Sequence, residues 1–340
     1  MKKLLSKNEF YLSAILLLVC LMIGSINGVF FSSGNIVDLI RTAIPYGIFG
    51  VSILLVILSG GIDVSFPAIA TLSTYITLLG FVNGNYKGNL FLFFLIPCVI
   101  GLLLGAVNGV LIAFFEFPPL IVTLATQSIY YGIQYTFFGS KRLTFLPEYI
   151  NEFSKAGLFT VIDENGMSYV FPVYFLVLVA VLLITFFVLK FTIAGRGIYA
   201  VGGSAGSAVR VGFNVKLLQI LVYGTAGAVA AIGGVVYTIM TRQGNPASLT
   251  GLEMTIISIA VLGGIDINGG KGSVFGLILG LTFFTVINNS LILIGLSSYW
   301  KTFVLGVAMY LYAATIAYKN KLQKNRVHEI ANEGLERKKG

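Results

Sequence analysis

Two polar segments carry the residue types best suited to chemistry in an otherwise apolar chain. Each contains the tetrapeptide Gly-Gly-Ile-Asp, at residues 60–63 and again at residues 263–266. An aspartate can cap a helix or bind a cation, and paired glycines let the backbone turn. Both features are costly where water is absent. We therefore predict two helix breaks that act as gates, formed by Gly60, Gly61, Asp63, Ser65, Gly263, Gly264 and Asp266.

The role of Asp63 has two interpretations. In the first, Asp63 or Ser65 caps the helix that restarts near Pro67 and fixes a bend. In the second, Asp63 faces an aqueous pathway or gate. The repeated tetrapeptide is also open to two readings, because a duplicated half is typical of transporters whereas a chain with 40 glycines can repeat it by chance.

Other polar side chains lie inside long apolar runs. Buried amides and hydroxyls there bond across helices, bond to their own helix, or face water. We treat five of them as possible pathway residues: Asn108, Thr123, Thr126, Asn288 and Asn289.

Several kinds of catalytic or binding site are excluded by the inventory of residues. The single histidine, His328, lies in a charged tail, so neither a histidine triad nor a zinc site is expected within the apolar part. Cys20 and Cys98 both lie in apolar runs and predict no disulfide or metal site. Residues 202–204 read Gly-Gly-Ser without the Gly-Lys-Ser/Thr of a phosphate loop. We expect no enzyme activity, no metal and no cofactor of its own.

The elements that must position these residues are membrane helices. The chain is 57% hydrophobic and only 10% charged, against about 25% charged in soluble proteins, and its mean hydropathy is +0.93. Because a span needs about 20 apolar residues, we predict an all-α polytopic membrane protein with broken helices. The ten predicted spans are residues 10–31, 42–59, 66–82, 90–114, 119–138, 169–191, 216–240, 253–263, 273–295 and 299–318.

The distribution of basic residues predicts the orientation. With the N-terminus inside, 15 of the 22 lysines and arginines lie on the cytoplasmic side. Both termini are then cytoplasmic, and the first span is read as uncleaved. We expect one membrane domain over residues 1–320, with an external loop at 139–168, a cytoplasmic loop at 192–215 and a charged cytoplasmic tail at 321–340. The net charge of +9 is thus a topology signal, and no nucleic-acid partner is expected.

The cytoplasmic loop at 192–215 has the composition of a docking segment. Small residues from Ser204 to Ala208 allow a short helix to lie close against another protein, with basic residues on either side. Ordinary positive-inside topology would explain the basic residues equally well. We predict that contact with a partner involves Arg196, Gly202, Gly203, Ser204, Ala205 and Arg210.

Four motifs, taken in order, resemble the ribose-type monosaccharide permeases of ABC importers. They are Leu-Ser-Gly-Gly-Ile-Asp-Val-Ser at 58–65, Pro-Leu-Ile-Val-Thr-Leu-Ala-Thr at 119–126, Gly-Arg-Gly-Ile-Tyr-Ala-Val-Gly-Gly at 195–203, and the closing stretch 259–301. The chain departs from the usual family pattern at Phe66-Pro67, at Ser204 and at residues 264–266, which leaves the exact solute open.

The resemblance implies a transport subunit in the cell membrane, in contact with lipid. Its expected partners are a cytoplasmic ABC ATPase that binds the ATP, an extracytoplasmic sugar-binding protein or lipoprotein, and a second permease subunit, identical or paralogous. The segment 195–214 would then hold the coupling helix. Alternatives are a permease for a sugar-like signalling molecule or nucleoside, and an ion-coupled secondary transporter that uses Asp63 and Asp266.

Overall fold

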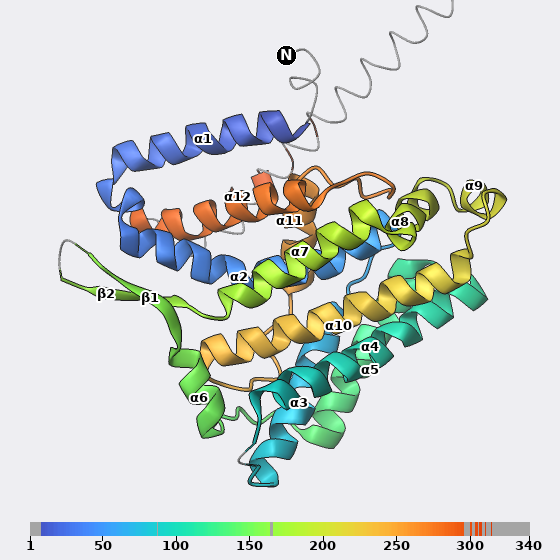
Figure 1. Cartoon of the computed structure of the whole chain (residues 1–340), viewed down its shortest axis with the longest axis horizontal. Helices are drawn as coiled ribbons and strands as arrows, with labels where there is room; N and C mark the ends of the chain where they lie inside the picture. Colours follow the sequence, from blue (N-terminus) through green and yellow to red (C-terminus); the bar gives the residue numbers. More distant parts are fainter. Residues whose placement is uncertain are drawn as a thin grey trace, which may run out of the picture.

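The computed structural model in Figure 1 describes residues 8–86, 88–163 and 166–295, together with isolated positions between 300 and 314. Within these residues the chain is predominantly helical. The helices are α1 (Asn8–Ile26), α2 (Ser33–Leu58), α3 (Phe66–Asn83), α4 (Leu90–Phe115), α5 (Pro119–Ile133), α6 (Glu148–Lys155), α7 (Phe175–Phe191), α8 (Ile193–Gly203), α9 (Ala205–Arg210), α10 (Val215–Thr241), α11 (Leu252–Leu262) and α12 (Val274–Leu293). A 3₁₀ turn, η1 (Gly28–Phe31), precedes α2, and a π turn, η2 (Gln134–Phe138), follows α5.

Nine of the ten predicted spans contain a helix in the described part of the chain. Five helices are long and apolar enough to cross a membrane, namely α2, α3, α4, α10 and α12, and the bent pair α7–α8 makes a sixth. The segment Leu12–Ile26 of α1 and helix α11 are apolar but shorter. The predicted span at 299–318 and the tail at 321–340 lie mostly or wholly outside the described residues. The polytopic helical architecture is confirmed, and the count of ten spans stays a prediction.

Helix α2 starts at Ser33, well before the predicted boundary at residue 42. Asp38 and Arg41 interrupt the apolar run and hide this first part from a hydropathy reading. The side chain of Ser32 caps the helix by accepting a 3.2 Å hydrogen bond from the backbone amide of Asn35. The cap and the later apolar face therefore define one continuous helix of 26 residues.

The predicted external loop and the next predicted span contain a β-hairpin that the all-α prediction lacks. Strand β1 (Gly157–Ile162) pairs antiparallel with β2 (Ser168–Pro172). The prediction that a helical span begins at residue 169 is wrong, because residues 168–172 pair as a strand and α7 begins only at Phe175. A run rich in aromatic and branched side chains suits a short strand as well as a helix.

The core lies around α2, whose second half is buried on all sides. Helix α10 lies against α4 with backbones almost in contact (Figure 1). A Cβ atom at Gly105 of α4 would overlap the carbonyl of Tyr223, and one at Gly101 would overlap the carbonyl of Gly227. Small residues at four-residue spacing let membrane helices approach this closely. The Ser52 hydroxyl then joins α2 to α10 by donating to the carbonyl of Ala226 at 2.8 Å.

Candidate functional site

The first helix break begins with a tight cap at the end of α2. Gly60 has a left-handed backbone with φ of 87°. Its amide donates to the carbonyl of Ile57 at 2.9 Å, and the amide of Gly61 donates to that of Val56 at 3.1 Å. These two bonds around a left-handed glycine form a Schellman cap. A Cβ at Gly61 would overlap the Tyr223 hydroxyl, so both glycines are needed here.

After this cap, Asp63 holds the extended segment that leads into α3. Its Oδ1 atom accepts 2.7 Å hydrogen bonds from both the backbone amide and the hydroxyl of Ser65. The amide side chain of Asn108 on α4 then donates to the Ser65 hydroxyl at 2.8 Å. Asp63, Ser65 and Asn108 are all buried. The structure thus places Asp63 and Ser65, predicted for the break, beside Asn108, predicted for the pathway.

Thr123 of α5 fastens the same segment from the other side. Its hydroxyl accepts from the amide of Val64 at 3.3 Å and donates to the carbonyl of Ile62 at 3.2 Å. These bonds satisfy backbone groups that no helix pairs, which a break at membrane depth requires. In this structure Thr123 and Asn108 are therefore attached to the break.

The second break, after α11, has the same cap in a different register. Gly264 is left-handed with φ of 84°. Its amide donates to the carbonyl of Val261 at 2.9 Å, and the amide of Ile265 donates to that of Ala260 at 3.2 Å. The left-handed residue is the second glycine of the tetrapeptide here and the first one in the other copy. The two aspartates are consequently at different distances in sequence from their left-handed glycines. The tetrapeptides are thus identical in sequence but differ in backbone structure.

Asp266 has an environment unlike that of Asp63. Its Oδ1 atom accepts 3.1 Å hydrogen bonds from the backbone amide and side chain of Asn268. Its Oδ2 atom lies 3.8 Å from Lys271 Nζ, whose side chain is 81% exposed. Asp266 therefore shapes a half-exposed turn. Each aspartate has its own set of partners, and within the described residues no three His, Cys, Asp or Glu side chains gather as a metal site would require.

Both breaks meet the end of α8 at a glycine junction, which we define as Gly60, Gly202, Gly203, Gly269 and Gly270. The amide of Gly270 donates to the carbonyl of Leu58 at 3.0 Å. A Cβ at Gly202 would overlap that same carbonyl, and one at Gly269 would lie 2.6 Å from the Cα atom of Gly60. The Tyr199 hydroxyl adds a 2.9 Å bond to the carbonyl of Gly272. Three segments far apart in sequence therefore touch through their backbones.

The glycine junction continues into the short helix α9. Helix α8 turns by 76° from α7, and Thr192 caps it by accepting a 3.1 Å bond from the amide of Gly195. The Ser204 hydroxyl then caps α9 by accepting from the amide of Ser207 at 3.3 Å. Most of α9 is exposed, including Arg210, and Val209 is 60% exposed. Residues 192–215 thus form two helices, the second presented outward.

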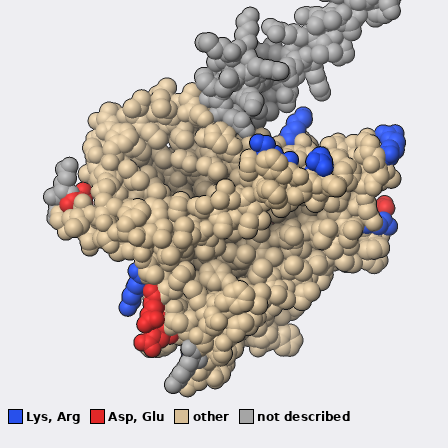
Figure 2. All heavy atoms as spheres, in the orientation of Figure 1, with Lys and Arg blue, Asp and Glu red and all other residues tan. Residues whose placement is uncertain are grey.

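A cleft of about 830 Å³ opens beside α9. We call it the inner cleft. It is lined by the first break, the start of α5, the α8–α9 turn and the start of α10, with Ser59, Pro118, Ser204, Lys216 and Asn268 among its residues. Lysine and arginine side chains gather around α8 and α9, as Figure 2 shows. The inner cleft therefore joins the basic end of the molecule to both breaks.

The remaining predicted pathway residues make their hydrogen bonds to groups outside the two breaks. Thr126 bonds to its own helix through the carbonyl of Val122 at 3.0 Å. Asn289 of α12 donates to the Thr42 hydroxyl of α2 at 3.4 Å, and Asn288 bonds to Asn289. Asn289 thus links α12 to α2, while Asn288 bonds only to its neighbour on α12. Arg196 is exposed on α8.

The sequence reading missed two contributors to the site and one polar pair elsewhere. Gly269 and Gly270 were visible as a glycine run, but their contact with Gly60 depends on the tertiary fold. Glu253, at the start of α11, is buried and accepts a short hydrogen bond from Gln127 of α5. A carboxylate inside a predicted span was a signal that could have identified this pair.

A family model of known proteins covers most of the chain. The family model described as "Branched-chain amino acid transport system / permease component" matches residues 35–313. The chain belongs to this family. The match covers both breaks, the inner cleft and α9, so the whole site described above is part of the permease component.

Two relatives of the chain are named after the solute that they import. The autoinducer 2 import system permease protein LsrC of Salmonella choleraesuis is 30% identical over 306 residues, covering 89% of this chain and 84% of the relative. The ribose import permease protein RbsC of Haemophilus influenzae is 30% identical over 308 residues, covering 89% and 90%. No solved structure gives a significant match. The resemblance drawn from the four motifs is confirmed.

Proposed function

We propose that the protein is the membrane permease subunit of an ABC importer for a monosaccharide or a sugar-like solute. The observation that carries the proposal is the exposed helix α9, attached through Gly202 to the first break and through Gly203 to the second. A partner that pushes on α9 would act on both breaks at once.

The mechanism follows from this backbone contact. A cytoplasmic ATPase would bind and hydrolyse ATP and shift α8 and α9 as one unit, with Arg196, Ser204, Ala205 and Arg210 at its contact surface. Because Gly202 touches Leu58 and Gly270 without intervening side chains, the displacement would reach both helix breaks with little loss. Alternating access requires such a two-state element in contact with the pathway.

The remaining partners follow from the importer class. An extracytoplasmic binding protein would deliver the solute, and a second permease subunit, identical or paralogous, would complete the pathway. In this proposal the end that carries α9 faces the cytoplasm, together with both termini. The end that carries α6 and the hairpin faces the outside. Reporter fusions at the termini and at residue 164 would test this orientation.

The proposed substrate class rests on the solutes named for the two relatives, which are ribose and autoinducer 2. Both names fit a small polyhydroxylated solute that a binding protein selects first. A nucleoside shares the ribose group and is the natural third candidate. Competition between these three solutes in one uptake assay would rank them.

The decisive experiment reconstitutes the chain in proteoliposomes with and without its ATPase and binding protein. We expect ATP-driven accumulation of labelled ribose or autoinducer 2 only in the complete assembly, with no ATP hydrolysis by the isolated chain. An ionophore should leave uptake unchanged. Accumulation by the isolated chain that collapses with an ionophore would instead establish an ion-coupled transporter.

A further inference from the structure

Helix α6 lies at the end of the molecule away from α9 (Figure 1). Its residues contribute to two clefts of opposite charge. On one flank is a basic pocket of about 320 Å³. On the other is an acidic groove of about 680 Å³. In Figure 2 acidic and basic side chains lie together beside α6. The two clefts form a surface whose charge changes sign within one short helix.

Three elements deliver the cations of the basic pocket: Arg41 comes from α2, Lys155 from the end of α6, and Arg242 from the end of α10. Arg41 is fixed by a 2.9 Å hydrogen bond from Nη2 to the carbonyl of Val170, and it lies 3.7 Å from Asp38. The buried Tyr174 lines the same pocket as Arg41 and Arg242.

The positive charge of this pocket is only partly compensated. Asp38 is the one acidic partner of its cations in the described part of the chain, and it pairs with Arg41 at the pocket's edge. Lys155 is exposed and forms no ion pair with any residue that the structure describes. The pocket therefore has the donors to receive a carboxylate or another oxyanion.

The acidic groove carries Glu148 and Glu152 from the exposed side of α6. Aromatic side chains line it as well, including Tyr149 and Phe145, which is 88% exposed. Neither glutamate forms an ion pair within the described residues. A basic or amphipathic side chain of another protein would find both a charge partner and an apolar wall there.

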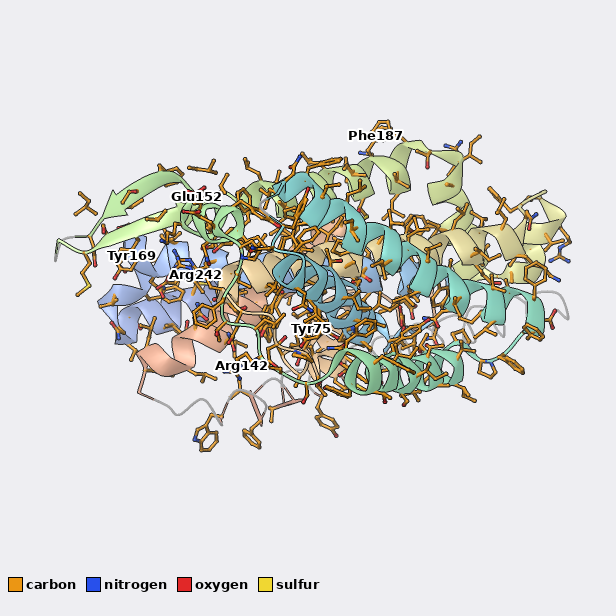
Figure 3. The ribbon with its side chains drawn as sticks, turned by 90° about the horizontal axis from the view of Figure 1, so that it is seen from below. Tyr75, Arg142, Glu152, Tyr169, Phe187 and Arg242 are labelled. Atoms are coloured by element: carbon orange, nitrogen blue, oxygen red, sulfur yellow. The ribbon has the colours of Figure 1, made fainter. Side chains whose placement is uncertain are left out.

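We propose that the α6 surface docks the extracytoplasmic binding protein, which inserts an acidic side chain into the basic pocket and lays a basic side chain in the acidic groove. This inference rests on the proposed function for the side of the membrane. Figure 3 shows Glu152 of the acidic groove at the hairpin end, together with Tyr169 and Arg242 of the basic pocket. Two opposite charges on one rigid helix fix the rotation of a partner, which a single charge does not.

A protein partner explains the surface better than an anionic lipid. A lipid headgroup would use the basic pocket alone and would be repelled by Glu148 and Glu152. Charge of one sign would then be expected on both flanks of α6. The alternating pattern matches a folded partner that carries both signs.

The test measures binding of the importer's own labelled binding protein to the complete permease–ATPase complex in nanodiscs of zwitterionic lipid. Lys155→Glu and Arg242→Glu should each weaken binding about tenfold, since reversing one charge of a close interfacial pair removes an attraction and adds a repulsion. The double variant Glu152→Lys with Lys155→Glu keeps the net charge and should weaken binding equally. Basal ATPase activity should not change.

Arg142→Glu is the matched control, because Arg142 is exposed and lines neither cleft. It should bind within twofold of the wild type. Lys155→Gln and Arg242→Gln replace the reversed variants if those unfold, and they should weaken binding less.

Four results would overturn the inference: unchanged binding in the reversed variants, equal loss with Arg142→Glu, full binding by the net-neutral double variant, or dependence on anionic lipid in place of the α6 charges. Failure of the wild-type complex to bind any binding protein would count against the proposed function as well.

Discussion

The backbone amide of Gly270 donates a 3.0 Å hydrogen bond to the carbonyl of Leu58, which ties the second helix break to the end of the first. The two residues are separated by most of the chain. Gly202 packs on the same carbonyl. One backbone oxygen of α2 is therefore the meeting point of both breaks and of the segment that leads to α9.

Gly202→Ala should impair transport strongly. Its Cβ would overlap the Leu58 carbonyl and crowd the Gly270 amide, and such overpacking costs about 1–3 kcal/mol. We expect a lower thermal unfolding midpoint and loss of ATP-driven uptake. Gly203→Ala is the control, because a Cβ there meets no atom within 4 Å. Equal loss in both variants would mean that the close approach is not the cause.

Asp63 and Asp266 should differ in their response to the same substitution. Asp63→Ala removes an acceptor for two buried hydrogen bonds and should destabilise the protein by about 0.5–2 kcal/mol, with Asp63→Asn intermediate. Asp266→Asn keeps the turn and loses only a pair with an exposed lysine, worth about 0–1 kcal/mol. Thermal unfolding in detergent measures both.

Transport assays separate a role of Asp63 in the break from contact with the solute. Asp63→Asn should slow uptake or reduce assembly while leaving the order of preference among competing sugars unchanged. A changed preference at a normal rate of uptake would show that Asp63 touches the solute.

The α4–α10 contact should be sensitive to single methyl groups. Gly105→Ala would push its Cβ into the Tyr223 carbonyl and separate the helices, so we expect a destabilisation of about 1–3 kcal/mol. Gly80→Ala in α3 meets no neighbour within 4 Å and improves helix propensity. Its unfolding midpoint should be equal to or above that of the wild type. If Gly105→Ala were as stable, the helices would have room that the structure lacks.

Helix α9 should bind the ATPase through its exposed residues. Val209→Asp in α9 and Val211→Asp directly after it alter side chains that are 60% and 72% exposed, so they should leave the unfolding midpoint unchanged. We expect the ATPase to be lost on co-purification. Ile162→Asp on the hairpin, 71% exposed, is the control and should retain the ATPase. Retention in all three variants would argue against docking at α9.

Much of the fold was predictable because membrane spans are long and apolar. Hydropathy located the helices from α3 to α5 and α10 to α12 to within a few residues. It failed where local bonds decide the structure. Ser32 caps α2 before its apolar run begins, and the segment at 168–172 pairs with a strand across a turn. A sum over residue hydropathies contains neither interaction.

Some features of the site were also predictable from the sequence, and others depend on the tertiary structure. By itself the sequence determined that residues 60–63 and 263–266 break helices, since paired glycines and an aspartate are costly in a continuous span. Only the tertiary structure decided that Asp63 is buried against Asn108 while Asp266 shapes a half-exposed turn. The left-handed glycine differs by one position between the two caps, and two tetrapeptides of identical sequence cannot encode that shift. The meeting of Leu58, Gly202 and Gly270 likewise depends on long-range packing, which brings together backbones that sequence separation keeps apart.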